Sequence, residues 1–223
     1  MNMKKTIALL AAGMLTVFAL TSCGTKTEVP ETTAAPTATA TAQASGKSLE
    51  ELTQNKDYAT ITVNVNGADK VLKAELYPDL APETVKNFEK LAAEDFYDGL
   101  IFHRVISGFM IQGGGYDANM QEKETASIKG EFDSNGFENP LKHTRGVLSM
   151  ARTNVPDSAS SQFFIMHQDY PSLDGEYAAF GKVIEGLEVV DEIAAVETKS
   201  LNNGMQDVPA DPVTIKSIEI TQE

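Results

Sequence analysis

The apolar runs of this 223-residue chain constrain its fold most, because from Tyr58 onward they are short and separated by Gly, Pro and Asn. The first of them, over 61–65, alternates apolar and polar residues and ends at Asn66-Gly67. Alternation of this kind is typical of a half-buried strand, and Asn-Gly is typical of a tight hairpin turn. The globular part of the chain is therefore predicted to fold mainly as β-structure.

Further elements are predicted from the remaining apolar runs. Strands are expected over 71–77, 101–106, 109–112, 146–151, 163–167, 178–184 and 213–220. Apolar residues that recur at intervals of three and four predict helices over 81–94 and 187–196, and a short amphipathic helix is expected over 48–56. Short strands at this density favour a sandwich or a barrel over a parallel sheet.

The N-terminus has the pattern of a secretion signal. Two lysines precede an apolar run over 6–20, which is shorter than the about 20 residues that a transmembrane helix needs. Cys23 directly follows Leu20-Thr21-Ser22. This order resembles the lipobox of bacterial lipoproteins, in which the signal is removed before a cysteine that then receives lipid. We therefore expect residues 1–22 to be a removed signal peptide and Cys23 to be lipidated, with an ordinary signal peptide as the alternative.

A lipidated Cys23 would anchor the protein to the extracytoplasmic face of a bacterial cell membrane, since several acyl chains together hold a protein on a bilayer. Residues 24–47 are rich in Thr, Ala and Pro, and so bury too little to offset the entropy of ordering. Residues 23–57 are accordingly expected to form the lipidated end and a disordered stalk. The folded domain is expected over 58–223.

The charge and the cysteine count exclude several classes of function. The chain has 32 acidic and 18 Lys or Arg residues, a formal net charge of −14. A field of this sign repels polyanions, which argues against nucleic-acid binding and against electrostatic docking on anionic lipid. One cysteine excludes an intrachain disulfide and a multi-cysteine metal site.

The densest cluster of motif residues runs over 102–114 with the sequence FHRVISGFMIQGG. Since side chains alternate faces along a strand, Phe102 and Arg104 are expected on one face, and Met110 and Gln112 on one face of the next strand. An arginine and a glutamine among Phe and Met would be costly if merely buried. The pattern indicates either a ligand-binding groove or an arginine paired with an acid at a barrel rim.

Other chemistries fit the sequence less well. The three histidines lack close metal-ligand spacing, and Ser107, Ser149 and Ser161 lack the G-x-S-x-G turn of an esterase. The glycines at 113–115 have neither the lysine of a phosphate-binding loop nor dinucleotide-binding spacing, so we expect a turn there.

Three further segments follow the cluster in order: SMAR over 149–152, SSQFFI over 160–165, and SLDGEYAAFGKV over 172–183. Together the four segments resemble the cyclophilin family of peptidyl-prolyl cis/trans isomerases, and the resemblance covers 58 to the C-terminus. It implies a closed eight-stranded antiparallel β-barrel capped by two α-helices. It also implies a monomeric isomerase without cofactor or metal, which acts on proline-containing unfolded or flexible polypeptides.

The resemblance also implies roles for individual residues. Arg104 is similar to the family's catalytic arginine, and Gln112 to the polar group that holds the substrate backbone. The walls of the proline pocket would be Phe109, Met110, Phe164 and Leu173. The adjoining groove would include Ala151, Thr153, Gln162 and Tyr177.

Two positions depart from the family pattern. Arg152 stands where eukaryotic relatives have Asn, and the loop that follows it is one residue longer. Ser172 replaces a Trp that contacts cyclosporin in those relatives, so we expect weak cyclosporin binding. A tethered module that grips proline segments with little turnover is the alternative to an enzyme, although Arg104 and Gln112 favour the enzyme.

Overall fold

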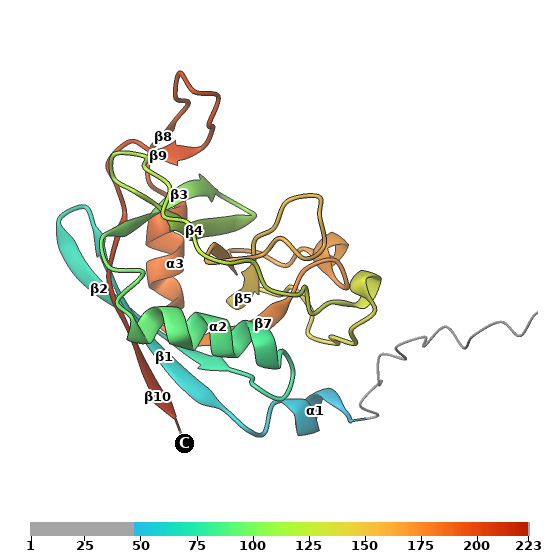
Figure 1. Cartoon of the computed structure of the whole chain (residues 1–223). Coiled ribbons are helices and arrows are strands. Elements are labelled where there is room, and N and C mark those ends of the chain that lie inside the picture. The colour runs from blue at the N-terminus through green and yellow to red at the C-terminus, as the bar shows by residue number, and fades with distance from the viewer. Residues whose placement is uncertain (1–46, 223) are drawn as a thin grey trace, which may run out of the picture. The chain divides into compact units, whose positions relative to one another are not determined.

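The structure, a computed structural model, describes residues 47–222; the expected signal peptide, Cys23 and most of the expected stalk lie outside the described residues. Eight strands close an antiparallel barrel in the order β1-β10-β3-β4-β6-β5-β7-β2 (Figure 1). This confirms the predicted barrel. The barrel strands are β1 (Asp57–Val65), β2 (Ala68–Leu76), β3 (Leu100–Ile106), β4 (Met110–Asp117), β5 (Val147–Met150), β6 (Phe163–Met166), β7 (Ala179–Glu185) and β10 (Thr214–Gln222).

Helices and a small hairpin complete the described part. The helices are α1 (Leu49–Leu52), α2 (Pro82–Ala93) and α3 (Leu187–Ala194), with 3₁₀ turns η1 (Asp133–Asn135) and η2 (Pro171–Leu173). Strands β8 (Thr198–Lys199) and β9 (Val208–Pro209) pair as a separate two-stranded sheet. No helix within 47–222 is long and apolar enough to cross a membrane.

The β1–β2 hairpin forms where the sequence predicts it. Its nine paired positions run from Asp57↔Leu76 to Val65↔Ala68. Asn66 and Gly67 have φ values of 51° and 81°, the left-handed pair that the tightest hairpin turn requires. Strand β1 begins at Asp57, four residues before the predicted alternation, and every second residue of it is buried in the barrel.

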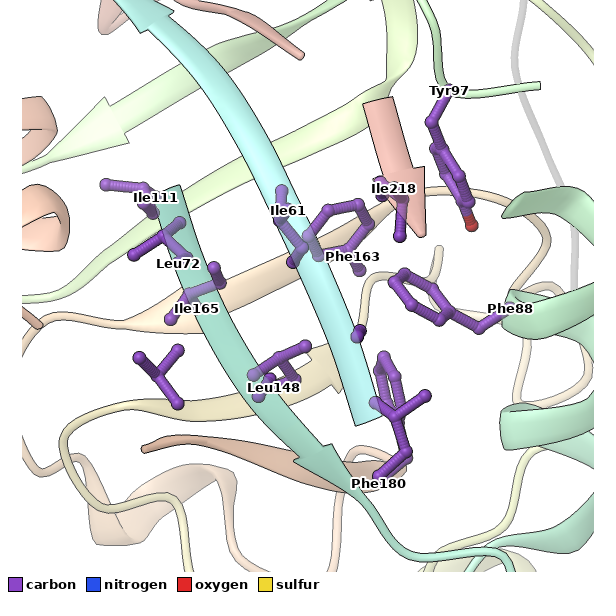
Figure 2. Packing of buried hydrophobic residues seen from close by; sticks show 14 of the residues in the cluster. Ile61, Leu72, Phe88, Tyr97, Ile111, Leu148, Phe163, Ile165, Phe180 and Ile218 are labelled. Carbon is purple, nitrogen blue, oxygen red and sulfur yellow. The ribbon is translucent and has the colours of Figure 1, made fainter. Parts of the chain in front are cut away.

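The barrel interior is filled by aliphatic and aromatic side chains from most of the strands (Figure 2). Phe88 of α2 closes one end, with its ring 5.4 Å from Phe163 in an edge-to-face arrangement and 5.3 Å from Phe180. Such aromatic pairs add about 0.5–1.5 kcal/mol to the free energy that their burial supplies. Helix α2 therefore packs against β6 and β7, and β6 carries Phe164 of the site described below.

The two long helices lie at opposite ends of the barrel. Glu89 of α2 accepts a hydrogen bond from Gln222 at the end of β10, whereas Glu192 of α3 pairs with Lys70 beside the β1–β2 hairpin, with 3.2 Å between the charged atoms. Both helices match their predicted ranges to within two residues. The predicted helix over 48–56 is mostly wrong, because only Leu49–Leu52 is helical.

The expectation that Phe102 and Arg104 share a face is also wrong. Strand β3 is bulged, since Phe102 pairs with Gly113 whereas Arg104 pairs with the adjacent Gln112. The extra residue reverses the alternation. Phe102 is fully buried in the barrel core, and Arg104 turns outward next to Gln112.

Gly113 to Gly115 do not form the predicted turn, because they lie within β4. The absence of side chains serves close packing here. A Cβ on Gly113 would lie 3.0 Å from the ring of Phe102, and one on Gly114 would lie 3.1 Å from the ring of Phe163. Gly114 also has φ +83°, which L side chains rarely adopt.

The segment that follows β4 is partly buried. Glu131 and Phe132 are each 1% exposed. Both carboxylate oxygens of Glu131 accept hydrogen bonds from the first turn of α2, from the backbone N–H of Glu83 (3.0 Å) and of Thr84 (2.8 Å). This matters because the residue before the helix, Ala81, offers no side-chain cap.

Candidate functional site

A pocket of about 120 Å³ opens on the outer face of the barrel, where β3, β4 and β6 lie side by side. Pairing of Gln112 with Phe164 and of Met110 with Met166 fixes the positions of neighbouring side chains. Between Met110 and Gln112, Ile111 points inward to the barrel core, so the two flanking residues share the outer face. This confirms the prediction that they lie on one face. The pocket is lined by Arg104, Phe109, Met110, Gln112, Ala151, Arg152, Phe164, Leu173 and Tyr177.

One side of the pocket is apolar. Met110 and Phe164 are 2% and 5% exposed and belong to a small hydrophobic cluster separate from the barrel core. Phe109, which directly precedes β4, and Leu173, the last residue of η2, pack against this cluster. The result is a concave apolar surface, and such a surface suits a small ring whose edge carries no polar atoms.

The other side of the pocket is a chain of polar side chains. Arg104 Nη1 lies 3.5 Å from Gln112 Oε1, and Gln112 Nε2 donates to Gln162 Oε1 at 3.0 Å. Arg104 forms no ion pair within the described residues. The guanidinium thus keeps unused donors beside the apolar surface, and the ion pair considered from the sequence alone is not found there.

A hydrogen-bonded chain of buried and half-buried side chains lies behind the pocket walls. Asp174 Oδ1 accepts from the backbone N–H of His143 at 2.8 Å and lies 3.3 Å from its Nδ1, and His143 Nε2 lies 3.0 Å from Ser149 Oγ. Asp174 follows Leu173, and the His143 ring stacks 6.0 Å from that of Phe164. The chain therefore braces two walls of the pocket.

This order of Ser, His and Asp resembles a hydrolase triad only in composition. Ser149 is fully buried, so no substrate reaches its hydroxyl. Burial lowers the pKa of His143, although Asp174 acts in the opposite direction. His103, beside Arg104, is neutral at physiological pH, because burial and then the Arg104 charge lower its pKa to about 4.

Arg152 is the lining residue that sequence reasoning did not assign to the site. Its guanidinium lies between two rings, 4.9 Å from Phe132 and 4.7 Å from Tyr177. It donates to the backbone carbonyls of Glu176 and Thr153 at 2.9–3.0 Å. The sequence indicated Arg152 only because eukaryotic relatives have Asn at this position. A single sequence does not show which rings the arginine contacts.

The remaining groove residues line an adjoining pocket. A second pocket of about 190 Å³ adjoins the first and shares Gln112, Ala151 and Arg152 with it. Thr153 and Gln162, which were expected in the groove, line this second pocket. Every predicted site residue within 47–222 therefore lines one of the two pockets, whereas Cys23 lies outside the described residues.

Comparison with known proteins connects this geometry to a family. The family model described as cyclophilin type peptidyl-prolyl cis-trans isomerase/CLD matches residues 60–220. The chain belongs to this cyclophilin family. It is thus a peptidyl-prolyl cis-trans isomerase, an enzyme whose substrates are proline-containing peptides.

Curated relatives and solved structures agree with this assignment. A peptidyl-prolyl cis-trans isomerase of Acinetobacter baylyi is 53% identical over 156 residues, which cover 67% of this chain and 79% of the relative. Peptidyl-prolyl cis-trans isomerase B of Escherichia coli is 45% identical over 172 residues, 73% of this chain and 99% of the relative.

Two of the similar solved structures are of a cyclophilin type peptidyl-prolyl cis-trans isomerase of Cryptosporidium parvum, and one of these two was obtained in the presence of the dipeptide Ala-Pro. The structure without the dipeptide is 32% identical to this chain, with a TM-score of 0.60. The match covers 75% of this chain and 99% of the chain in that structure.

Proposed function

We propose that this isomerase acts on proteins outside the cytoplasm while lipid on Cys23 tethers it to the bacterial cell membrane. The observation that carries the catalytic part is the placement of Arg104, which has no ion pair within 47–222, beside an apolar pocket. The tether is supported by the sequence pattern over 1–23. Residues 23–57 would be the stalk and 58–223 the catalytic domain, acting as a monomer.

The chemistry explains why such a pocket suffices. Rotation about a peptide bond has a barrier of about 18–20 kcal/mol, because the nitrogen lone pair is delocalised into the carbonyl. Before proline both isomers are populated, and they exchange in tens to hundreds of seconds. No covalent bond breaks, so the enzyme accelerates the exchange by binding the twisted bond more tightly than the planar one.

Each side of the pocket has a role in that preference. The apolar wall of Phe109, Met110, Phe164 and Leu173 would hold the pyrrolidine ring still while the residue before it rotates. Arg104, permanently charged, would donate to the prolyl nitrogen.

The nitrogen accepts a hydrogen bond only when it loses conjugation, so this donation is available in the transition state and not in either planar isomer. Gln112, held at 3.0 Å by Gln162, would bind the substrate backbone. Arg104 and Gln112 are therefore the proposed catalytic pair.

The tether also fits the charge of the chain. Removal of residues 1–22 takes away Lys4 and Lys5, so that 16 basic and 32 acidic residues remain and the formal charge falls from −14 to −16. An anionic bilayer repels a domain of this charge. The stalk would let the domain stand away from the membrane with its pocket open to clients.

Substitution of the lipid-accepting residue tests the tether. Cys23→Ser in the full chain should abolish incorporation of labelled fatty acid and move the protein from the membrane fraction to the extracytoplasmic soluble fraction. A second variant, Ser22→Ala, serves as the control, because it keeps the cysteine and a small residue before it. Fatty-acid labelling of the Cys23→Ser variant at the level of the unsubstituted chain would overturn the proposal.

A further inference from the structure

A third pocket, of about 330 Å³, lies on the other side of Arg104 from the proline pocket. His103, Arg104, Tyr116 and Gln162 line it from the barrel, and residues 204–207 line it from the β8–β9 hairpin. It is larger than either of the pockets described above. None of the roles assigned so far uses residues 204–207.

The hairpin is fixed against the barrel, so the pocket is part of the fold. Val105 of β3 donates its backbone N–H to the carbonyl of Asp207 at 2.8 Å, and Leu201 donates to the carbonyl of Met205, also at 2.8 Å. Asp207 has φ 58°, a left-handed conformation that few residues other than glycine adopt. Figure 1 shows the hairpin beside β3.

Hydrogen bonds join the third pocket to the other two. Arg104 lines both the first and the third pocket, and Gln162 lines both the second and the third. Gln112 lies between them, 3.5 Å from Arg104 and 3.0 Å from Gln162. A polypeptide bound at the proline pocket thus has a continuous surface along which to extend toward the hairpin.

The lining of the third pocket indicates what it binds. The ring of Tyr116 packs edge-on against His103, with 4.7 Å between the ring centres, and the two rings give the pocket an aromatic wall. Met205 faces the same space, and methionine adapts its shape to varied apolar groups. Gln162 and Gln206 add amide groups suited to a peptide backbone.

We propose that the third pocket binds an apolar or aromatic side chain of the client polypeptide, a few residues away from the proline, so that long substrates gain contacts which short peptides lack. The proposal rests on the placement of the proline ring next to Arg104 in the proposed function. It makes Met205 a specificity-determining residue for the known reaction.

Filling the pocket tests the proposal. Met205→Trp in the full chain should lower a ratio of two specificity constants, kcat/KM for a long substrate divided by kcat/KM for a proline tetrapeptide. The expected decrease is about five- to tenfold, which corresponds to the loss of one to two buried CH₂ groups. The long substrate is a denatured protein whose refolding is limited by proline isomerisation. Asn202→Trp adds the same ring at an exposed position of the same hairpin outside the pocket lining, and should leave the ratio unchanged.

A second variant shows whether the effect of Met205→Trp comes from a misfolded hairpin. Met205→Ala removes apolar contact without adding bulk and should also lower the ratio. The proposal is overturned if both Met205 variants keep the ratio of the unsubstituted chain, or if Asn202→Trp lowers it equally. Failure of the underlying catalytic assignment is distinguishable, because Arg104→Ala would then retain turnover of the tetrapeptide.

Discussion

Glu131 offers the sharpest test of how the segment after β4 supports the fold. In Glu131→Gln the side chain keeps one acceptor oxygen and replaces the other with an NH₂ group, which faces a backbone N–H of α2. One hydrogen bond to a charged group is lost, one becomes neutral, and a buried N–H is left without a partner.

Hydrogen bonds to charged groups contribute about 1.5–3 kcal/mol, and an unsatisfied buried N–H costs about 1–3 kcal/mol. Burial raises the pKa of Glu131, so removal of its charge recovers part of this loss. We expect a net decrease of about 2 kcal/mol in the free energy of unfolding. For a domain of this size that lowers Tm by about 4–8 °C.

Chemical and thermal unfolding of the full chain would measure the change. Glu138→Gln is the matched control, because it makes the same chemical change at an exposed position of the same segment, and its effect should stay within about 0.5 kcal/mol. Equal stability of the two variants would refute the argument that Glu131 caps α2.

Two further predictions concern Glu89 and Gly115. Burial and then Asp57 raise the pKa of Glu89 to about 7 from 4.5, so folding favours its protonated form. The free energy of unfolding should therefore fall as pH rises between about 4.5 and 7. Glu89→Gln should flatten this fall when unfolding is measured from pH 4 to 8. An unchanged slope of the unfolding free energy against pH would contradict the assignment. Gly115→Ala would place a Cβ against Cγ of Gln162 and 2.7 Å from its Nε2, displacing the hydrogen-bond partner of Gln112, which is proposed to bind the substrate backbone. We expect kcat/KM to drop about tenfold or more while the fold persists, and wild-type turnover would show that Gln162 has no positioning role.

Much of the fold was predictable because its signals are local. Alternation and Asn66-Gly67 define the first hairpin, and helical spacing defines α2 and α3 to within two residues. The glycines of β4 were misassigned because glycine also marks turns, and only the packing of Phe102 and Phe163 against them explains their place in a strand. Likewise, nothing in the local sequence indicates the bulge that turns Arg104 outward.

The site was predictable as far as its residues belong to ordered motifs. Every motif residue expected in the groove within 47–222 lines a pocket. The missing parts depend on partners distant in sequence: Arg152 between two rings, Glu131 at the start of α2, and His143 hydrogen-bonded to Asp174. Such pairings are set by the closed barrel and have no local sequence signal.

Arg104 is proposed to stabilise the twisted prolyl bond, and the kinetics of Arg104→Ala test this role most directly. We expect kcat for a proline tetrapeptide to fall about 100-fold or more with little change in KM, because the donated hydrogen bond is made only in the transition state. Arg145→Ala, which removes an arginine that pairs with Asp191 and does not line the proline pocket, should retain kcat. A kcat for Arg104→Ala within twofold of the unsubstituted enzyme would contradict the account.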